Sequence, residues 1–131
     1  MILNPQHLKI FGNNISIGDY ATLITAPDKR IDLSTWETDK INGELQLGKY
    51  ILISPGTSIR SAQKIVIGDS TMIASDVTIT DSDWHDIYDR TDYVASPKEV
   101  IIQENVWIGE KSLILKGCLL YTSPSPRDVC S

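Results

Sequence analysis

The sequence is short of cysteine and histidine, and each shortage excludes a class of protein. The two cysteines, Cys118 and Cys130, lie among the last 14 of 131 residues, and His7 and His85 are the two histidines. A cysteine-free stretch before residue 118 excludes a disulfide scaffold and a cysteine-rich zinc site. The same stretch suits a reducing compartment, so we expect a cytoplasmic protein without a resident metal ion.

Long apolar runs are missing as well. No stretch approaches the roughly 20 apolar residues of a membrane helix, so we expect no membrane span. The opening residues, Met1 to Pro5, lack the basic and apolar regions of a secretory signal. The net charge is -5, from 12 Lys and Arg against 17 Asp and Glu. This excess of acid argues against nucleic acid as a partner, because phosphates require a basic face.

A six-residue repeat is present instead. Ile67, Ile73 and Ile79 recur at this spacing, and each is followed by a small residue: Gly68, Ala74 and Thr80. Compact residues, Thr71 and Val77, stand four places after the first two. The same frame runs through Ile17-Leu23, Leu47-Ile53-Ile59 and Ile108-Ile114, with a slip of two residues between Ile59 and Ile67.

A period of six fits neither a helix nor a simple alternating strand over this distance. It predicts short strands joined by tight turns, three hexads to a triangular coil, with the aliphatic residues pointing inward and stacking from coil to coil. Only a small residue fits beside each aliphatic, because backbone crowds backbone at the corner. We therefore predict an all-β protein, a parallel β-helix of hexapeptide repeats; an ordinary β-sandwich with Ile-rich strands is the alternative.

Two segments interrupt the hexads. Residues 26–44, around Trp36, predict a distorted coil, and residues 81–99 form a polar and aromatic insertion. Long excursions from a regular scaffold often carry binding and catalysis. The predicted domain is residues 1–117 with the insertion at 81–99.

The last residues do not continue the repeat. Cys118 to Asp128 resemble, residue for residue, a translation of the transposase adapter used to build sequencing libraries. The prolines in this string cannot serve an interior strand. We therefore expect residues 118–131 to be a non-native, disordered tail and the β-helix to be truncated near Gly117.

Two strings carry a resemblance to a known family. Val77 to Asp86, Val-Thr-Ile-Thr-Asp-Ser-Asp-Trp-His-Asp, runs from a hexad into an acidic loop ending in histidine; Asn105 to Gly109, Asn-Val-Trp-Ile-Gly, opens the next coil. Over about residues 15–117 the chain resembles the hexapeptide-repeat acyltransferases, in particular the branch that acetylates sugars and polysaccharide precursors. The resemblance implies a left-handed β-helix, acetyl-CoA as acyl donor, a sugar or glycan acceptor, and a homotrimer with active sites between chains.

His85 is the expected catalytic residue. Acyl transfer from a thioester needs a base for the proton of the attacking group, and an imidazole with a pKa of about 6.5 suits that task. Family members use the corresponding histidine in this way without a covalent intermediate. The alternative is a loop histidine that only pairs with Asp83 or Asp86.

The other residues of the insertion are the expected acceptor site. Carboxylates could orient His85 or accept bonds from sugar hydroxyls, and aromatic faces could stack on sugars. Equally, the acidic residues could be solvated and the aromatics could pin the loop to the helix wall. The predicted substrate-binding residues are Asp81, Asp83, Trp84, Tyr88 and Arg90, with Asp86 and Tyr93 nearby.

Trp107 and Gly109 are the expected cofactor-binding residues, since the family lines the pantetheine arm of coenzyme A with this coil. An N–H of Gly109 could meet the thioester oxygen as charge develops; alternatively, Gly109 is simply a corner residue. Family members often carry a small residue or Ser at the next position, where this chain has Glu110, which puts a contact from position 110 in doubt.

Four functions are compatible with these features to different degrees. The preferred one is acetyl-CoA-dependent O-acetylation of a sugar or glycan precursor, and N-acetylation of an aminosugar or small amine is the second. A non-catalytic trimeric β-helix module is the third. A β-helix carbonic anhydrase fits poorly, because two histidines cannot supply its zinc site. We expect the chain on its own, without further coils, to be inactive and prone to associate.

Overall fold

Short parallel strands account for almost all regular structure in the protein. The computed structural model describes residues 2–3, 5–37, 41–82 and 98–120. These residues form 15 strands and one 3-10 turn, Pro5–His7, and they contain no α-helix. No helix among them is long and apolar enough to cross a membrane.

The strands make three parallel sheets of five strands each, named A, B and C here. Sheet A contains β1 (Ile2–Leu3), β4 (Thr22–Ile24), β7 (Leu52–Ile53), β10 (Met72–Ile73) and β13 (Trp107–Ile108). Sheet B contains β2 (Leu8–Phe11), β5 (Ile31–Thr35), β8 (Ser58–Ser61), β11 (Thr78–Thr80) and β14 (Leu113–Ile114). Sheet C contains β3 (Ile15–Ile17), β6 (Leu45–Leu47), β9 (Ile65–Ile67), β12 (Val100–Ile102) and β15 (Leu119–Leu120).

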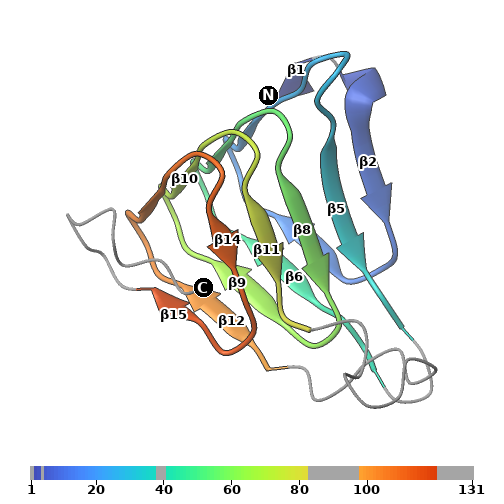
Figure 1. The fold of residues 1–131 in the computed structure, drawn as a ribbon, viewed down its shortest axis with the longest axis vertical. Coiled ribbons are helices and arrows are strands. Elements are labelled where there is room, and N and C mark those ends of the chain that lie inside the picture. The colour runs from blue at the N-terminus through green and yellow to red at the C-terminus, as the bar shows by residue number, and fades with distance from the viewer. Residues whose placement is uncertain (1, 4, 38–40, 83–97, 121–131) are drawn as a thin grey trace.

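The chain visits sheets A, B and C in turn, so three consecutive strands make one coil. Each strand pairs in parallel with the strand three places along the chain, as for β5 with β8 and β8 with β11. Figure 1 shows the strands of sheet B side by side from β2 to β14. The described residues thus form a left-handed parallel β-helix with five coils among them, as predicted, and the β-sandwich alternative is wrong because it would require antiparallel pairing.

Columns of aliphatic side chains fill the interior. In sheet B the residues Leu33, Ile59, Ile79 and Ile114 lie in register on successive strands, and each has 0% of its surface exposed. The compact residues of the hexads are buried beside them, with Thr71 and Val77 also at 0%. The stacked columns confirm the inward direction predicted for the repeat.

Small residues at the corners are required by close backbone approach. A Cβ added to Gly68 would lie 2.5 Å from the backbone nitrogen of Glu104, one coil away. One added to Gly18 would lie 2.5 Å from the carbonyl carbon of Gly48. Both distances are far below van der Waals contact, so a side chain is excluded at this position of the corner between sheets C and A.

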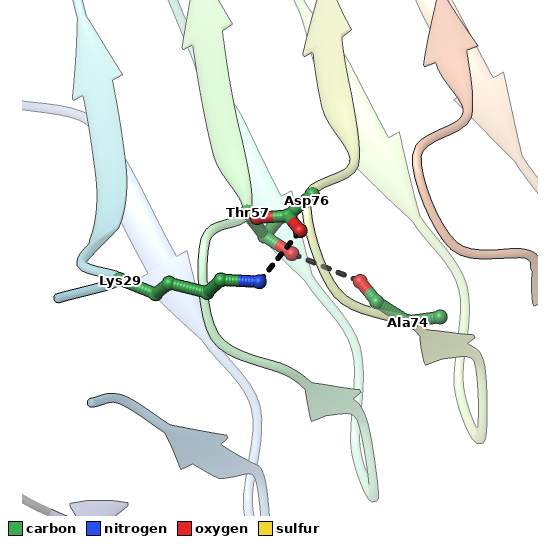
Figure 2. A network of polar contacts seen from close by, with 4 residues as sticks. All are labelled: Lys29, Thr57, Ala74 and Asp76. Atoms are coloured by element: carbon green, nitrogen blue, oxygen red, sulfur yellow. Dashed lines mark hydrogen bonds and ion pairs between the residues drawn. The ribbon is translucent and has the colours of Figure 1, made fainter.

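The corner between sheets A and B is tied across coils by polar contacts (Figure 2). The Nζ atom of Lys29, in the second coil, lies 2.9 Å from Oδ2 of Asp76, in the fourth. The hydroxyl of buried Thr57 donates to the carbonyl of Ala74 over 3.2 Å. The hydrogen bond from Lys29 to Asp76, with their charge attraction, raises the pKa of the Lys29 ammonium above its ordinary 10.5. Any stability from this exposed pair is present at neutral pH and lost only as the pH rises through that raised pKa.

The corner between sheets B and C, here called the B/C corner, accepts most of the irregular length. From Ile114 to Leu120 the chain crosses it in six residues, the hexad distance, and from Ile59 to Ile67 it takes eight, which is where the predicted slip lies. From Leu33 to Leu47 it takes 14, and from Ile79 to Ile102 it takes 23. The insertion at 81–99 therefore opens at the B/C corner. The segment 26–44 has extra length at two corners, because Leu23 to Leu33 takes 10 residues across the corner between sheets A and B.

The β-helix continues three residues past the boundary predicted at Gly117. Leu119 and Leu120 form β15 and pair with Ile101 and Ile102, and Leu120 is buried. The physical reason is that Leu120 follows Ile114 by six residues and so falls on the inward position of the repeat. The rest of the predicted tail, residues 121–131, lies outside the described residues, and its resemblance to adapter read-through stays a prediction.

Candidate active site

The insertion predicted to carry catalysis leaves the β-helix at the B/C corner and returns there. The backbone N–H of Lys98 donates to the carbonyl of Asp81 over 2.9 Å, which closes the neck of the excursion. Residues 83–97 lie outside the described residues. The predicted roles of His85, Asp83, Trp84, Tyr88 and Arg90, and of Asp86 and Tyr93 beside them, therefore stay predictions.

Asp81 is the predicted site residue that the structure describes most fully. It has 0% exposure, and both carboxylate oxygens accept hydrogen bonds. Oδ1 accepts from the N–H of Ala62 over 2.7 Å, whereas Oδ2 accepts from Gln63 N–H over 2.8 Å, Lys64 N–H over 2.7 Å and the Ser61 hydroxyl over 3.0 Å. Charge-assisted bonds of this kind are about twice as strong as neutral ones, and here they offset the cost of burying a carboxylate.

The β-helix itself places Asp81 over these donors. Thr80 pairs with Arg60 in the register of β11 and β8. The residues that follow them, Asp81 and Ser61, therefore lie one coil apart at the same corner, and both are buried. Residues 61–64 turn the same corner one coil below and present their N–H groups to the carboxylate. Asp81 thus has the geometry of a positioning residue that fixes the neck to the scaffold, and this geometry gives no support to its predicted contact with an acceptor.

The donors around Asp81 were not anticipated from the sequence. Ser61 precedes Asp81 by 20 residues, which is one coil plus the slip of two, so aligning coils instead of hexads would have paired them. The hydroxyl oxygen of Ser61 also lies 2.8 Å from the carbonyl oxygen of Glu44, which is a second acceptor for its one proton. Ser61 therefore links three successive passages of the chain through this corner.

Trp107 and Gly109, the predicted cofactor-binding residues, lie at the last coil of sheet A. Trp107 pairs with Met72 on the outward side of the sheet, and 60% of its surface is exposed. A Cβ on Gly109 would meet only the Ser112 hydroxyl, at 3.9 Å, so its backbone is accessible. One coil earlier, the N–H of Ala74 donates to the carbonyl of Ile108. Gly109 is the equivalent residue of the next coil, so its N–H points past β13, the last described strand of sheet A.

The neck of the excursion and the predicted cofactor-binding residues lie on different sides of the β-helix. The neck at Asp81 lies at the B/C corner, whereas Trp107 projects outward from sheet A. In a three-sided coil, the corner between two sheets lies across the interior from the third sheet. The loop carrying His85 and the surface of Trp107 and Gly109 therefore start from different sides of the molecule.

The part of the chain that the structure describes contains no set of side chains placed to bind a metal ion. No group of three or more His, Cys, Asp or Glu side chains is close enough there to hold an ion.

The fold and the neck define a class of protein, a left-handed β-helix with one long excursion from a corner. Within that class the chain is similar to the polysialic acid O-acetyltransferase of Escherichia coli O1:K1 / APEC, with 32% identity over 92 residues. The similar region covers 62% of this chain and 30% of that protein, so the chain spans less than a third of its relative's length. No protein-family model and no solved structure matches the chain.

Proposed function

We propose that this protein is an acyltransferase that moves an acetyl group from acetyl-CoA to a hydroxyl of a sugar or glycan precursor. The observation that carries the proposal is the longer of the two excursions, which contains His85 and is anchored at its neck by buried Asp81. Similarity to a polysialic acid O-acetyltransferase supports the same reaction class and a glycan as acceptor. The absence of cysteine before residue 118 is consistent with catalysis in a reducing cytoplasm.

In the proposed reaction His85 is the general base. Its imidazole takes the proton from the acceptor hydroxyl while the oxygen attacks the thioester carbonyl. The C–S bond then breaks, the ester forms, and the leaving thiolate receives the proton as free CoA thiol. Asp83, Trp84, Tyr88 and Arg90 are proposed to hold the sugar, since they share the loop with His85. Asp81 supports this group by fixing the neck.

Trp107 and Gly109 are proposed to bind acetyl-CoA. Exposed Trp107 offers an apolar face to the pantetheine arm, and the accessible N–H of Gly109 can stabilise the developing oxyanion. These residues and the neck lie on different sides of one chain, and we propose that a neighbouring copy completes the site. A homotrimer with sites between chains supplies such a copy.

Transfer of labelled acetyl groups tests the proposal directly. The protein expressed from its complete gene is incubated with acetyl-CoA labelled in the acetyl group and with an acidic or a neutral oligosaccharide. We expect label on the oligosaccharide, released by mild alkali as an ester would be. Alkali-stable label would instead indicate an amide and favour N-acetylation. No transfer to any sugar, with intact acetyl-CoA binding, would contradict the proposal.

A further inference from the structure

An aromatic and cationic patch lies on the outer face of sheet B, beside the neck of the excursion. We infer that this patch, made of Phe11, Trp36 and Arg60, binds an acidic saccharide, specifically one whose sugar units carry carboxylates. The inference rests on the proposed function and adds a binding site for the acceptor on the scaffold, beyond the residues already proposed to hold the sugar.

The aromatic part of the patch is preformed. The rings of Phe11 and Trp36 have centroids 4.7 Å apart and are tilted by 39°. Although they contact each other, Phe11 is 48% and Trp36 40% exposed. The indole N–H of Trp36 donates to the hydroxyl of Ser34 over 3.3 Å, which fixes the orientation of its ring. An exposed, oriented aromatic pair is the surface on which the apolar face of a pyranose stacks.

The cationic part is Arg60 on β8, which lies one strand from β5 and two strands from Phe11 on β2. Phe11, Ser34, Arg60 and Thr80 form one row across β2, β5, β8 and β11. This row lies on the outer face of sheet B, because Ile59 and Ile79, which directly precede Arg60 and Thr80, point inward. Neighbouring strands are about 4.8 Å apart, so Arg60 stands about 10 Å from Phe11 along this row. Arg60 is exposed, and no carboxylate among the described residues pairs with its guanidinium.

Charge makes this arginine selective for an anion. The protein carries a net charge of -5, which repels acidic polymers from most of its surface. An unpaired guanidinium binds a carboxylate through two parallel N–H bonds, a geometry that a neutral sugar cannot supply. A carboxylated sugar bound at Arg60, with a neighbouring unit on the rings of Phe11 and Trp36, would satisfy both parts of the patch.

The position of the patch relates it to the proposed reaction. Thr80, the next residue in the row after Arg60, directly precedes Asp81 at the neck of the excursion. A polymer held along this row would therefore run toward the start of the loop that carries His85. The patch is thus placed to present a long acceptor to the site.

Binding measurements on the whole protein test the inference without using its activity. The probes are size-defined polysialic acid, a neutral dextran of similar length, and polyglutamate as a carboxylate polymer without sugar rings. We expect polysialic acid to bind, and we expect Arg60→Gln to weaken this binding about tenfold or more. Trp36→Leu should weaken it as well. Lys49→Gln, which removes the same charge at the corner between sheets C and A, should change it less than about twofold.

Several results would overturn the inference. Equal losses in Arg60→Gln and Lys49→Gln would indicate non-specific charge, and equal binding of polyglutamate would indicate an anion site without sugar recognition. Dextran binding that is unchanged by Arg60→Gln would show that the patch does not select acidic saccharides. Self-association that depends on Trp36, without any glycan binding, would assign the patch to a second copy of the chain. Because His85→Ala should bind polysialic acid normally, failure of the patch and failure of the proposed reaction are distinguishable.

Discussion

Asp81 shows how one residue connects the scaffold to the excursion. A carboxylate with no exposure is unfavourable unless nearly all its acceptor capacity is used, and here three N–H groups and one hydroxyl use it. Its backbone carbonyl meanwhile binds Lys98 at the far end of the loop. A single residue thus fixes both ends of the neck to the coil below.

Asp81→Asn should destabilise the protein by about 2–3 kcal/mol, because an amide nitrogen must replace one oxygen and face N–H donors. Denaturant unfolding measures this. The control is Asp69→Asn, since exposed Asp69 accepts one bond, from Lys49 N–H over 2.7 Å, which an amide oxygen can keep. A change within about 0.5 kcal/mol is expected there. Equal effects of the two substitutions would contradict the anchoring role of Asp81.

Thr57→Val should cost no more than about 1 kcal/mol, the net contribution of one buried hydrogen bond. Val77 occupies the equivalent inward position one coil later and is fully buried, so the site accepts an isosteric apolar side chain. Thermal unfolding measures the difference. A much larger loss would mean that the bond from Thr57 to the carbonyl of Ala74 links the coils more strongly than packing does.

The elements of the β-helix were largely predictable because each hexad places one aliphatic residue inward. Columns such as Ile59, Ile79 and Ile114 follow from a local spacing that sequence shows directly. The contacts of Asp81 and the patch at Arg60 were not predictable in this way. Both join residues from different coils, and the excursions at the B/C corner change the coil length from 18 residues to larger numbers. Register between coils therefore cannot be counted from the sequence alone.

Gly68→Ala should destabilise the corner between sheets C and A by about 2 kcal/mol or more, because its Cβ would lie 2.5 Å from backbone. Gly109→Ala is the matched control. The equivalent residue one coil earlier is Ala74, and the new Cβ would only touch the Ser112 hydroxyl at 3.9 Å. Unfolding midpoints of the two variants compare these corners, and similar losses would contradict the steric explanation for the small residues of the hexad.

At the scale of the whole molecule, sheet A presents apolar side chains to solvent. Met72 and Trp107 are adjacent on its outer face and are 48% and 60% exposed. Tyr20 and Tyr50 stack at the corner that leads into this sheet, with ring centroids 5.1 Å apart. An apolar row of this kind is unusual on a monomer and is consistent with the proposed association of chains.

Light scattering of the protein from the complete gene should give three times the mass of one chain. Met72→Lys places a charge in the apolar row and should shift the protein toward monomers, whereas Lys9→Gln, on the outer face of sheet B, should not. A monomer that transfers acetyl groups at the full rate would contradict the proposal that the site needs a neighbouring copy.

The central claim is that His85, in the loop that leaves this β-helix, is the general base for acetyl transfer. The most direct measurement is kcat/KM for acetyl transfer by His85→Ala and His7→Ala, made in the complete protein, since His7 lies in the first coil outside the proposed site. We predict a loss of about 10²–10⁴-fold for His85→Ala and an unchanged value for His7→Ala. Unchanged turnover in a folded His85→Ala variant would contradict the claim.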